Sequence, residues 1–129
     1  MNCSEEAQRA HDSCAADIVA SHARLAHRAR MEAERTARAA AIAQNFIAVV
    51  VGGETEKLSQ LGSPAFVRDW MASVAEKRVD TTQWASLTQS GASQVRPSRW
   101  EVVYRSANQQ VVVLVEEGGG ISRVIALRQ

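Results

Sequence analysis

The sequence has almost no excess of charge of either sign. Fifteen lysines and arginines face fourteen aspartates and glutamates, so the formal net charge of the 129 residues is +1. Proteins that bind nucleic acid usually carry a basic excess that neutralises phosphates, so we do not expect nucleic acid as a partner. The segment 24–38, with five arginines and two glutamates, is locally basic. It leaves nucleic-acid contact open as an alternative to a solvated helix face.

Long apolar runs are missing as well. No stretch reaches the roughly 18–20 apolar residues of a membrane-spanning helix, and Met1–Glu6 lacks the apolar centre of a secretory signal. We therefore expect no membrane span and a cytoplasmic location, or an extracytoplasmic one if an upstream anchor is missing. Cys3 and Cys14 are the two cysteines. On one helix they would lie about 16 Å apart, beyond disulfide reach, so we expect reduced thiols.

Proline and glycine are absent from residues 4–50, which are rich in the helix formers Ala, Arg, Glu, Gln and Leu. This composition predicts one long helix that ends at Gly52-Gly53. Small residues recur along it at spacings of three and four, which is the rhythm of a helix–helix seam. The predicted interaction seam consists of Val19, His22, Ala26, Ala29, Ala33, Thr36 and Ala40. We expect residues 1–40 to form a projecting amphipathic helix and residues 41–129 a compact domain.

The remaining sequence predicts short helices followed by strands. A short helix is expected near Glu54–Leu61, and Ser63-Pro64 begins a second one that ends in Lys77-Arg78. Trp84–Thr88 is predicted as a first strand and Gln89–Pro97 as irregular. Three strands with alternating apolar residues follow, joined by hairpin loops at 106–109 and 117–120. The predicted fold class is α+β, with a long N-terminal helix, a short helix pair and a curved antiparallel meander.

Signatures of catalysis are also missing. The sequence contains no G-x-S-x-G, no H-E-x-x-H and no P-loop, and its three histidines all fall within residues 1–27. His11, Cys14 and His22 are too few and too spread along one helix for a zinc site. Asp69 and Asp80 are interpreted as surface carboxylates. We therefore expect no catalytic residue, no cofactor and no metal.

Five aromatic residues have two interpretations. They are either plain core or the lining of a ligand pocket, and the sequence leaves both open. The set consists of Phe66, Trp70, Trp84, Trp100 and Tyr104.

Two segments carry a resemblance to a known superfamily. The order of elements resembles the nuclear transport factor 2-like cone fold. Residues 43–66, AQNFIAVVVGGETEKLSQLGSPAF, and the closing residues 100–129, WEVVYRSANQQVVVLVEEGGGISRVIALRQ, are similar to actinobacterial extracytoplasmic members, including conjugation-apparatus and Mce-associated proteins. The resemblance covers roughly residues 40–129 and implies a curved sheet packed on helices. It implies no catalytic residue that can be matched to a position here.

These observations together predict a non-catalytic protein-interaction or assembly module, an accessory of a secretion or conjugation-type apparatus. Its partners would be proteins, and we expect a homodimer formed through the helix seam. His22 would make such pairing sensitive to pH, because histidine gains a charge near neutrality. The alternative is a small-molecule-binding or isomerase- or hydrolase-like enzyme of the same cone fold. A deep apolar pocket that contains a buried acid or histidine would favour this alternative.

Overall fold

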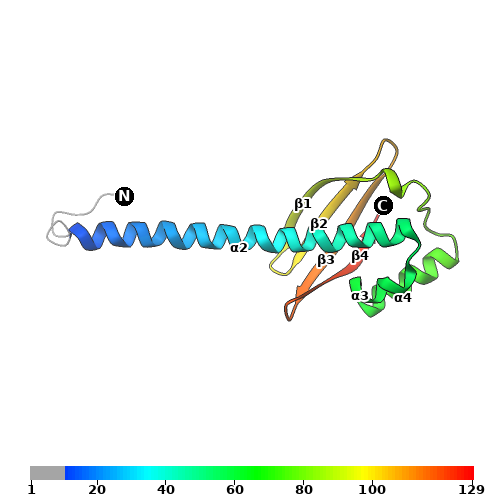
Figure 1. Ribbon diagram of the computed structural model, residues 1–129, viewed down its shortest axis with the longest axis horizontal. Coiled ribbons are helices and arrows are strands. Elements are labelled where there is room, and N and C mark those ends of the chain that lie inside the picture. Colours follow the sequence, from blue (N-terminus) through cyan, green and yellow to red (C-terminus); the bar gives the residue numbers. More distant parts are fainter. Residues whose placement is uncertain (1–10) are drawn as a thin grey trace. The chain divides into compact units, whose positions relative to one another are not determined.

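The protein has the α+β fold that the sequence predicts. A computed structural model describes residues 11–129, with side-chain environments from residue 18 onward. The long helix α2 (His11–Gly52) is followed by the 3₁₀ turn η1 (Thr55–Lys57) and the helices α3 (Leu58–Leu61) and α4 (Pro64–Ala75). A second 3₁₀ turn, η2 (Trp84–Ser86), leads into the sheet. Its strands are β1 (Thr88–Arg96), β2 (Arg99–Arg105), β3 (Gln110–Gly118) and β4 (Ile121–Arg128) (Figure 1).

The chain divides into two units between Arg35 and Thr36. The described part of the first unit is helix alone. The second unit contains the end of α2, the short helices and the whole sheet. The sequence places this boundary after residue 40. In the structure the second unit begins at Thr36, and Ala39 is buried in its core. Within residues 11–129, no helix combines the length and apolarity that crossing a bilayer requires.

The ends of two helices follow from local sequence chemistry. Gly53 has a φ of 69°, its N–H bonds to the carbonyl of Val50, and the N–H of Glu54 bonds to the carbonyl of Val49. These two bonds form a Schellman motif, which satisfies the last free carbonyls of α2. At the start of α4, the Ser63 side chain accepts a hydrogen bond of 3.3 Å from the N–H of Phe66. The predicted N-cap of this helix is thereby confirmed.

The sheet is an antiparallel meander with strand order β1-β2-β3-β4. The three strands with alternating apolar residues are confirmed, and β3 and β4 are joined by a tight turn at Gly119-Gly120, both with positive φ. The prediction for the first strand is wrong. Trp84–Ser86 forms η2, and β1 shares only Thr88 with the predicted strand, since its other residues fall in the stretch that the sequence marks as irregular. Only Ala92 of β1 is even half-buried, so burial imposes no alternation on this strand.

One face of the sheet forms the core of the second unit. Trp100, Val102 and Tyr104 of β2 lie beside Val115, Val113 and Val111 of β3, and all six are buried. They belong to one apolar cluster with residues of α2, α3 and α4. On the opposite face, cross-strand ion pairs join Arg99 to Glu116 and Arg128 to Glu101. The sheet is therefore apolar toward the helices, and its other side carries these ion pairs beside Val103, Val112 and Leu114.

Candidate interaction surface on α2

An uncharged strip runs along α2 in the first unit. Successive residues of an α-helix turn by about 100°, so seven side chains between residues 18 and 33 fall within an arc of about 120°. Every charged residue from 18 to 35 lies outside this arc. We call this strip the apolar arc, and its members are Ile18, Val19, His22, Leu25, Ala26, Ala29 and Ala33.

The apolar arc is uncovered. Val19 has 68% of its surface exposed and Leu25 has 59%, and both are among the most exposed large hydrophobic residues of the described chain. His22, Ala26, Ala29 and Ala33 are exposed as well, and Ile18 is half-buried. A helix of a soluble protein normally turns an apolar face of this width against a neighbouring element. Exposure therefore makes the apolar arc a candidate contact surface.

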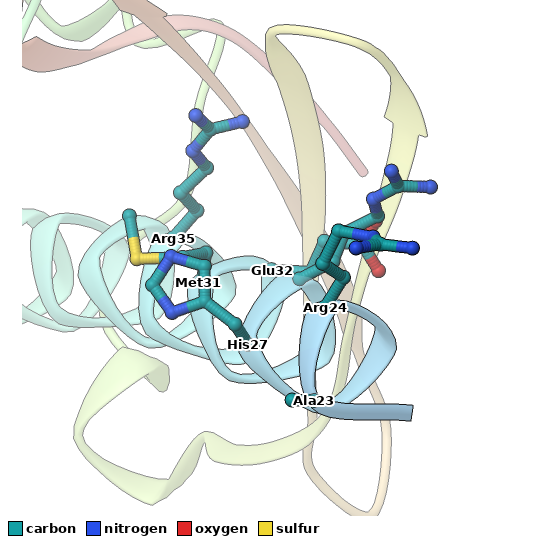
Figure 2. Close-up of a pocket in the computed structure, with 7 residues that line it drawn as sticks. Ala23, Arg24, His27, Met31, Glu32 and Arg35 are labelled. Atoms are coloured by element: carbon teal, nitrogen blue, oxygen red, sulfur yellow. The ribbon is translucent and has the colours of Figure 1, made fainter. Parts of the chain in front are cut away.

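The other side of the same helix segment is basic. Arg24, His27, Arg28, Met31 and Arg35 lie around a shallow surface hollow, together with Ala23 and Glu32 (Figure 2). The Arg24 guanidinium donates a hydrogen bond of 3.1 Å to the Ser21 hydroxyl. Because residues of one helix alone form this hollow, it is a gap between long side chains and encloses no ligand-sized space. The helix is thus amphipathic, with a charged side that water solvates and an uncharged side.

Two members of the predicted seam belong to the second unit and have different surroundings. The Thr36 hydroxyl accepts a hydrogen bond of 3.1 Å from the indole N–H of Trp100, which is buried in the sheet. Ala40 is half-buried beside the core residues Ala39 and Ala43. The seam predicted from spacing therefore combines residues that pack within the second unit with residues of the apolar arc. It also omits Leu25 and Ile18, which a period of 3.6 residues would have included.

The five predicted pocket-lining aromatics are all buried. Phe66, Trp70 and Trp84 gather around Phe46 of α2, with ring centroids 5.4 to 6.2 Å from the Phe46 ring. Trp100 and Tyr104 lie on the core face of β2. Trp84, Trp100 and Tyr104 are therefore core residues, which is the first of the two interpretations. Burial raises the pKa of Tyr104 to about 12, and its hydroxyl has no hydrogen-bond partner among the described residues.

Phe66 and Trp70 also border a hollow between α4 and β4. We call it the α4–β4 hollow. It has a volume of about 320 Å³, near the lower limit for ligand pockets. The lining comes from α4 and β4, together with Val79 from the segment after α4. The lining consists of Ala65, Phe66, Asp69, Trp70, Ser73, Val79, Ile125, Ala126 and Leu127.

The acidic residues near this hollow are both exposed. Asp69 lies at its border. The Asp80 carboxylate accepts hydrogen bonds from the hydroxyl and the N–H of Thr82, at 2.7 and 3.0 Å. Both bonds lower the pKa of Asp80, and the bond from the Thr82 hydroxyl has the larger effect. They show that Asp80 organises a turn. Among the residues whose side chains are described, no charged residue is buried as a whole, although one carboxylate oxygen of Glu117 is, and no cluster of acids, histidines and cysteines could hold a metal. His11 and Cys14 lie outside that part of the chain.

Comparison with known proteins gives one structural likeness. No protein-family model matches the chain, and no curated protein matches it in sequence. A crystal structure of a protein of unknown function from Bacteroides thetaiotaomicron is similar, with a TM-score of 0.53 and 14% sequence identity. The match covers 84% of this chain and 99% of that one. At this identity the likeness concerns the fold alone.

Proposed function

We propose that the protein is a non-catalytic interaction module that pairs with a second copy of itself through the apolar arc of α2. The observation that carries this proposal is an uncharged face of about 120°, which is wide enough for helix packing and lies open to water. A two-fold pair places the same surface on both copies, so an arc without Arg, Lys, Asp or Glu meets its own copy, and His22 is the one member whose charge depends on pH. The three small members of the arc, Ala26, Ala29 and Ala33, let two helix backbones approach closely, whereas the imidazole of His22 takes more room.

The association should be weak. Only Ile18, Val19 and Leu25 contribute large apolar side chains, and alanine buries little area. We expect a dissociation constant in the tens of micromolar, which corresponds to about −6 kcal/mol. A surface of this strength suits assembly with other proteins, where several weak contacts act together. On the resemblance stated above, we propose a cone-fold accessory of a secretion or conjugation-type apparatus, and the order of helices and strands supports that relation.

Sedimentation equilibrium tests the proposal with two matched variants. Ala26→Glu puts a charge into the apolar arc, and Ala20→Glu puts the same charge on the opposite side of the helix. Each new glutamate has an arginine four residues later, Arg30 or Arg24, so both variants gain the same helix-stabilising pair. We expect the parent chain and Ala20→Glu to dimerise and Ala26→Glu to stay monomeric. If the parent chain is a monomer at several hundred micromolar, or if Ala26→Glu dimerises as the parent does, the apolar arc is not a pairing surface.

The second candidate is a small-molecule-binding protein or enzyme of the same fold. The observation in its favour is the α4–β4 hollow, which has two aromatic residues and a carboxylate in its lining. Asp69 is exposed, whereas an acid that serves as a general base in such a fold would be held in a buried pocket. This geometry supports binding better than proton transfer.

A further inference from the structure

The α4–β4 hollow combines apolar walls with one charge. Most of its lining is alkyl or aromatic, and the wall contributed by β4 is Ile125, Ala126 and Leu127. Asp69 is its one charged lining residue. None of the ion pairs in the described part of the chain involves Asp69. The hollow therefore offers an unneutralised carboxylate beside an apolar surface.

The neighbours of Asp69 have partners of their own. The Ser73 hydroxyl donates a hydrogen bond of 2.8 Å to the backbone carbonyl of Asp69, so it does not engage the carboxylate. Trp70 is fixed by the aromatic cluster, with its ring centroid 5.4 Å from that of Phe46 and 5.4 Å from that of Trp84. Among the described residues, the Asp69 carboxylate therefore has no hydrogen-bond or ion-pair partner, and it stands next to an aromatic residue that core packing holds in place.

We propose that the α4–β4 hollow binds a small organic cation, an alkylammonium carried on an aromatic ring. The ammonium pairs with Asp69, and the ring packs between the α4 wall at Phe66 and Trp70 and the β4 wall at Leu127. Charge complementarity favours a cationic ligand. Asp69 would repel an anionic ligand, and a neutral alcohol could form no ion pair with it. The volume of about 320 Å³ accommodates a single-ring molecule. This site is independent of the apolar arc, since its residues belong to α4 and β4.

Binding is tested with 2-phenylethylammonium and two matched probes, the neutral 2-phenylethanol and the anionic phenylacetate. Two-dimensional NMR of the ¹⁵N-labelled full chain reports the affinity and the location together. We expect shifts at the Trp70 indole and at the amides of Ser73 and Ala126, and millimolar binding. The ammonium should bind about fivefold more tightly than the alcohol, the magnitude of an exposed ion pair, and phenylacetate should bind most weakly. Raising the salt concentration should reduce this preference.

Variants separate the charge from the cavity. Asp69→Asn should bring the ammonium-to-alcohol preference close to one while the alcohol affinity stays unchanged. Asp80→Asn is the matched control, because Asp80 is an exposed acid that does not line the hollow. Ala65→Trp, at an exposed lining position, should fill the hollow and remove binding of both probes, with circular dichroism confirming the fold. The proposal is overturned if no shifts occur at about 10 mM probe, if shifts map elsewhere, or if Asp69→Asn retains the preference.

Discussion

The hydrogen bond between Thr36 and Trp100 makes a sharp test of how α2 is joined to the sheet. Trp100 is 1% exposed, and its indole N–H donates to the Thr36 hydroxyl at 3.1 Å. Thr36→Val keeps the branched shape and a similar helix propensity but removes the acceptor. The indole N–H is then left buried without a partner, at a cost of about 1–3 kcal/mol. Because Thr36 is half-exposed and water can reach its side of the bond, we expect the lower part of that range, about 1.5 kcal/mol.

The corresponding thermal shift follows from the size of the second unit. With about 2.1 cal/mol/K of unfolding entropy per residue, the roughly 90 residues from Thr36 onward give about 0.2 kcal/mol/K. A loss of about 1.5 kcal/mol therefore lowers Tm by roughly 7 °C. Urea unfolding followed by circular dichroism measures the free energy, and Thr36→Ser, which keeps the hydroxyl, is the control and should cost much less.

A double-mutant cycle decides whether the hydrogen bond is the cause. In a Trp100→Phe background the donor is gone, so Thr36→Val should then cost only a few tenths of a kcal/mol. Circular dichroism rather than fluorescence is the suitable signal, because this background removes a tryptophan. If Thr36→Val costs the same in both backgrounds, the loss comes from packing or helix propensity, and the reasoning about the indole N–H is refuted.

Three further predictions concern the backbone and the core. Tyr104 is the single tyrosine of the chain, and burial raises its pKa to about 12, so absorbance at 295 nm should titrate near pH 12 in the folded protein and near pH 10 in urea. Because the pKa of Tyr104 is higher in the folded state than in the unfolded state, its contribution to stability is fully present below about pH 10 and is lost as the pH rises toward 12. Tyr104→Phe should remove this loss of stability, and titration of Tyr104 near pH 10 in the folded protein would contradict the prediction. Gly53→Ala should cost about 1 kcal/mol because Gly53 has a φ of 69°, whereas Gly52→Ala, inside the helix, should be neutral or slightly stabilising in the same urea titration. Lys77 occupies the equivalent left-handed position after α4, with a φ of 56°, so Lys77→Gly should stabilise the protein by about 0.5–1 kcal/mol, and a loss of stability would show that the lysine side chain has a role of its own.

Local chemistry made the helix ends and hairpins predictable. Gly53 and Ser63 act within a few residues of their own position, so the sequence alone identifies the C-cap of α2 and the N-cap of α4. The alternation of Trp100, Val102 and Tyr104 with less apolar or less buried residues in β2 likewise reports one buried face. These features need no knowledge of the rest of the chain.

Features that depend on distant partners were not predictable in the same way. β1 has polar residues on both faces, and its strand conformation comes from pairing with β2. Thr36 has the spacing of a seam residue, but its partner is 64 positions away in the sequence. The α4–β4 hollow forms between residues 65–79 and 125–127, so no local pattern around Asp69 marks it. Spacing along a helix identifies which residues share a face and leaves the neighbour of that face undetermined.

The two edges of the sheet limit how copies of the protein can join. On β1, the pairing register shifts between Gln89 and Gly91 and again between Gln94 and Arg96, so regular backbone pairing is interrupted near both ends of the strand. Along β4, the Ser63 N–H bonds to the Val124 carbonyl at 2.9 Å and Gly62 bridges to the same residue. A growing fibre needs a strand edge with a continuous row of free backbone groups, and both edges here depart from that condition. Backbone pairing between copies is therefore disfavoured at both edges of the sheet, and any contact between copies would have to use side-chain surfaces.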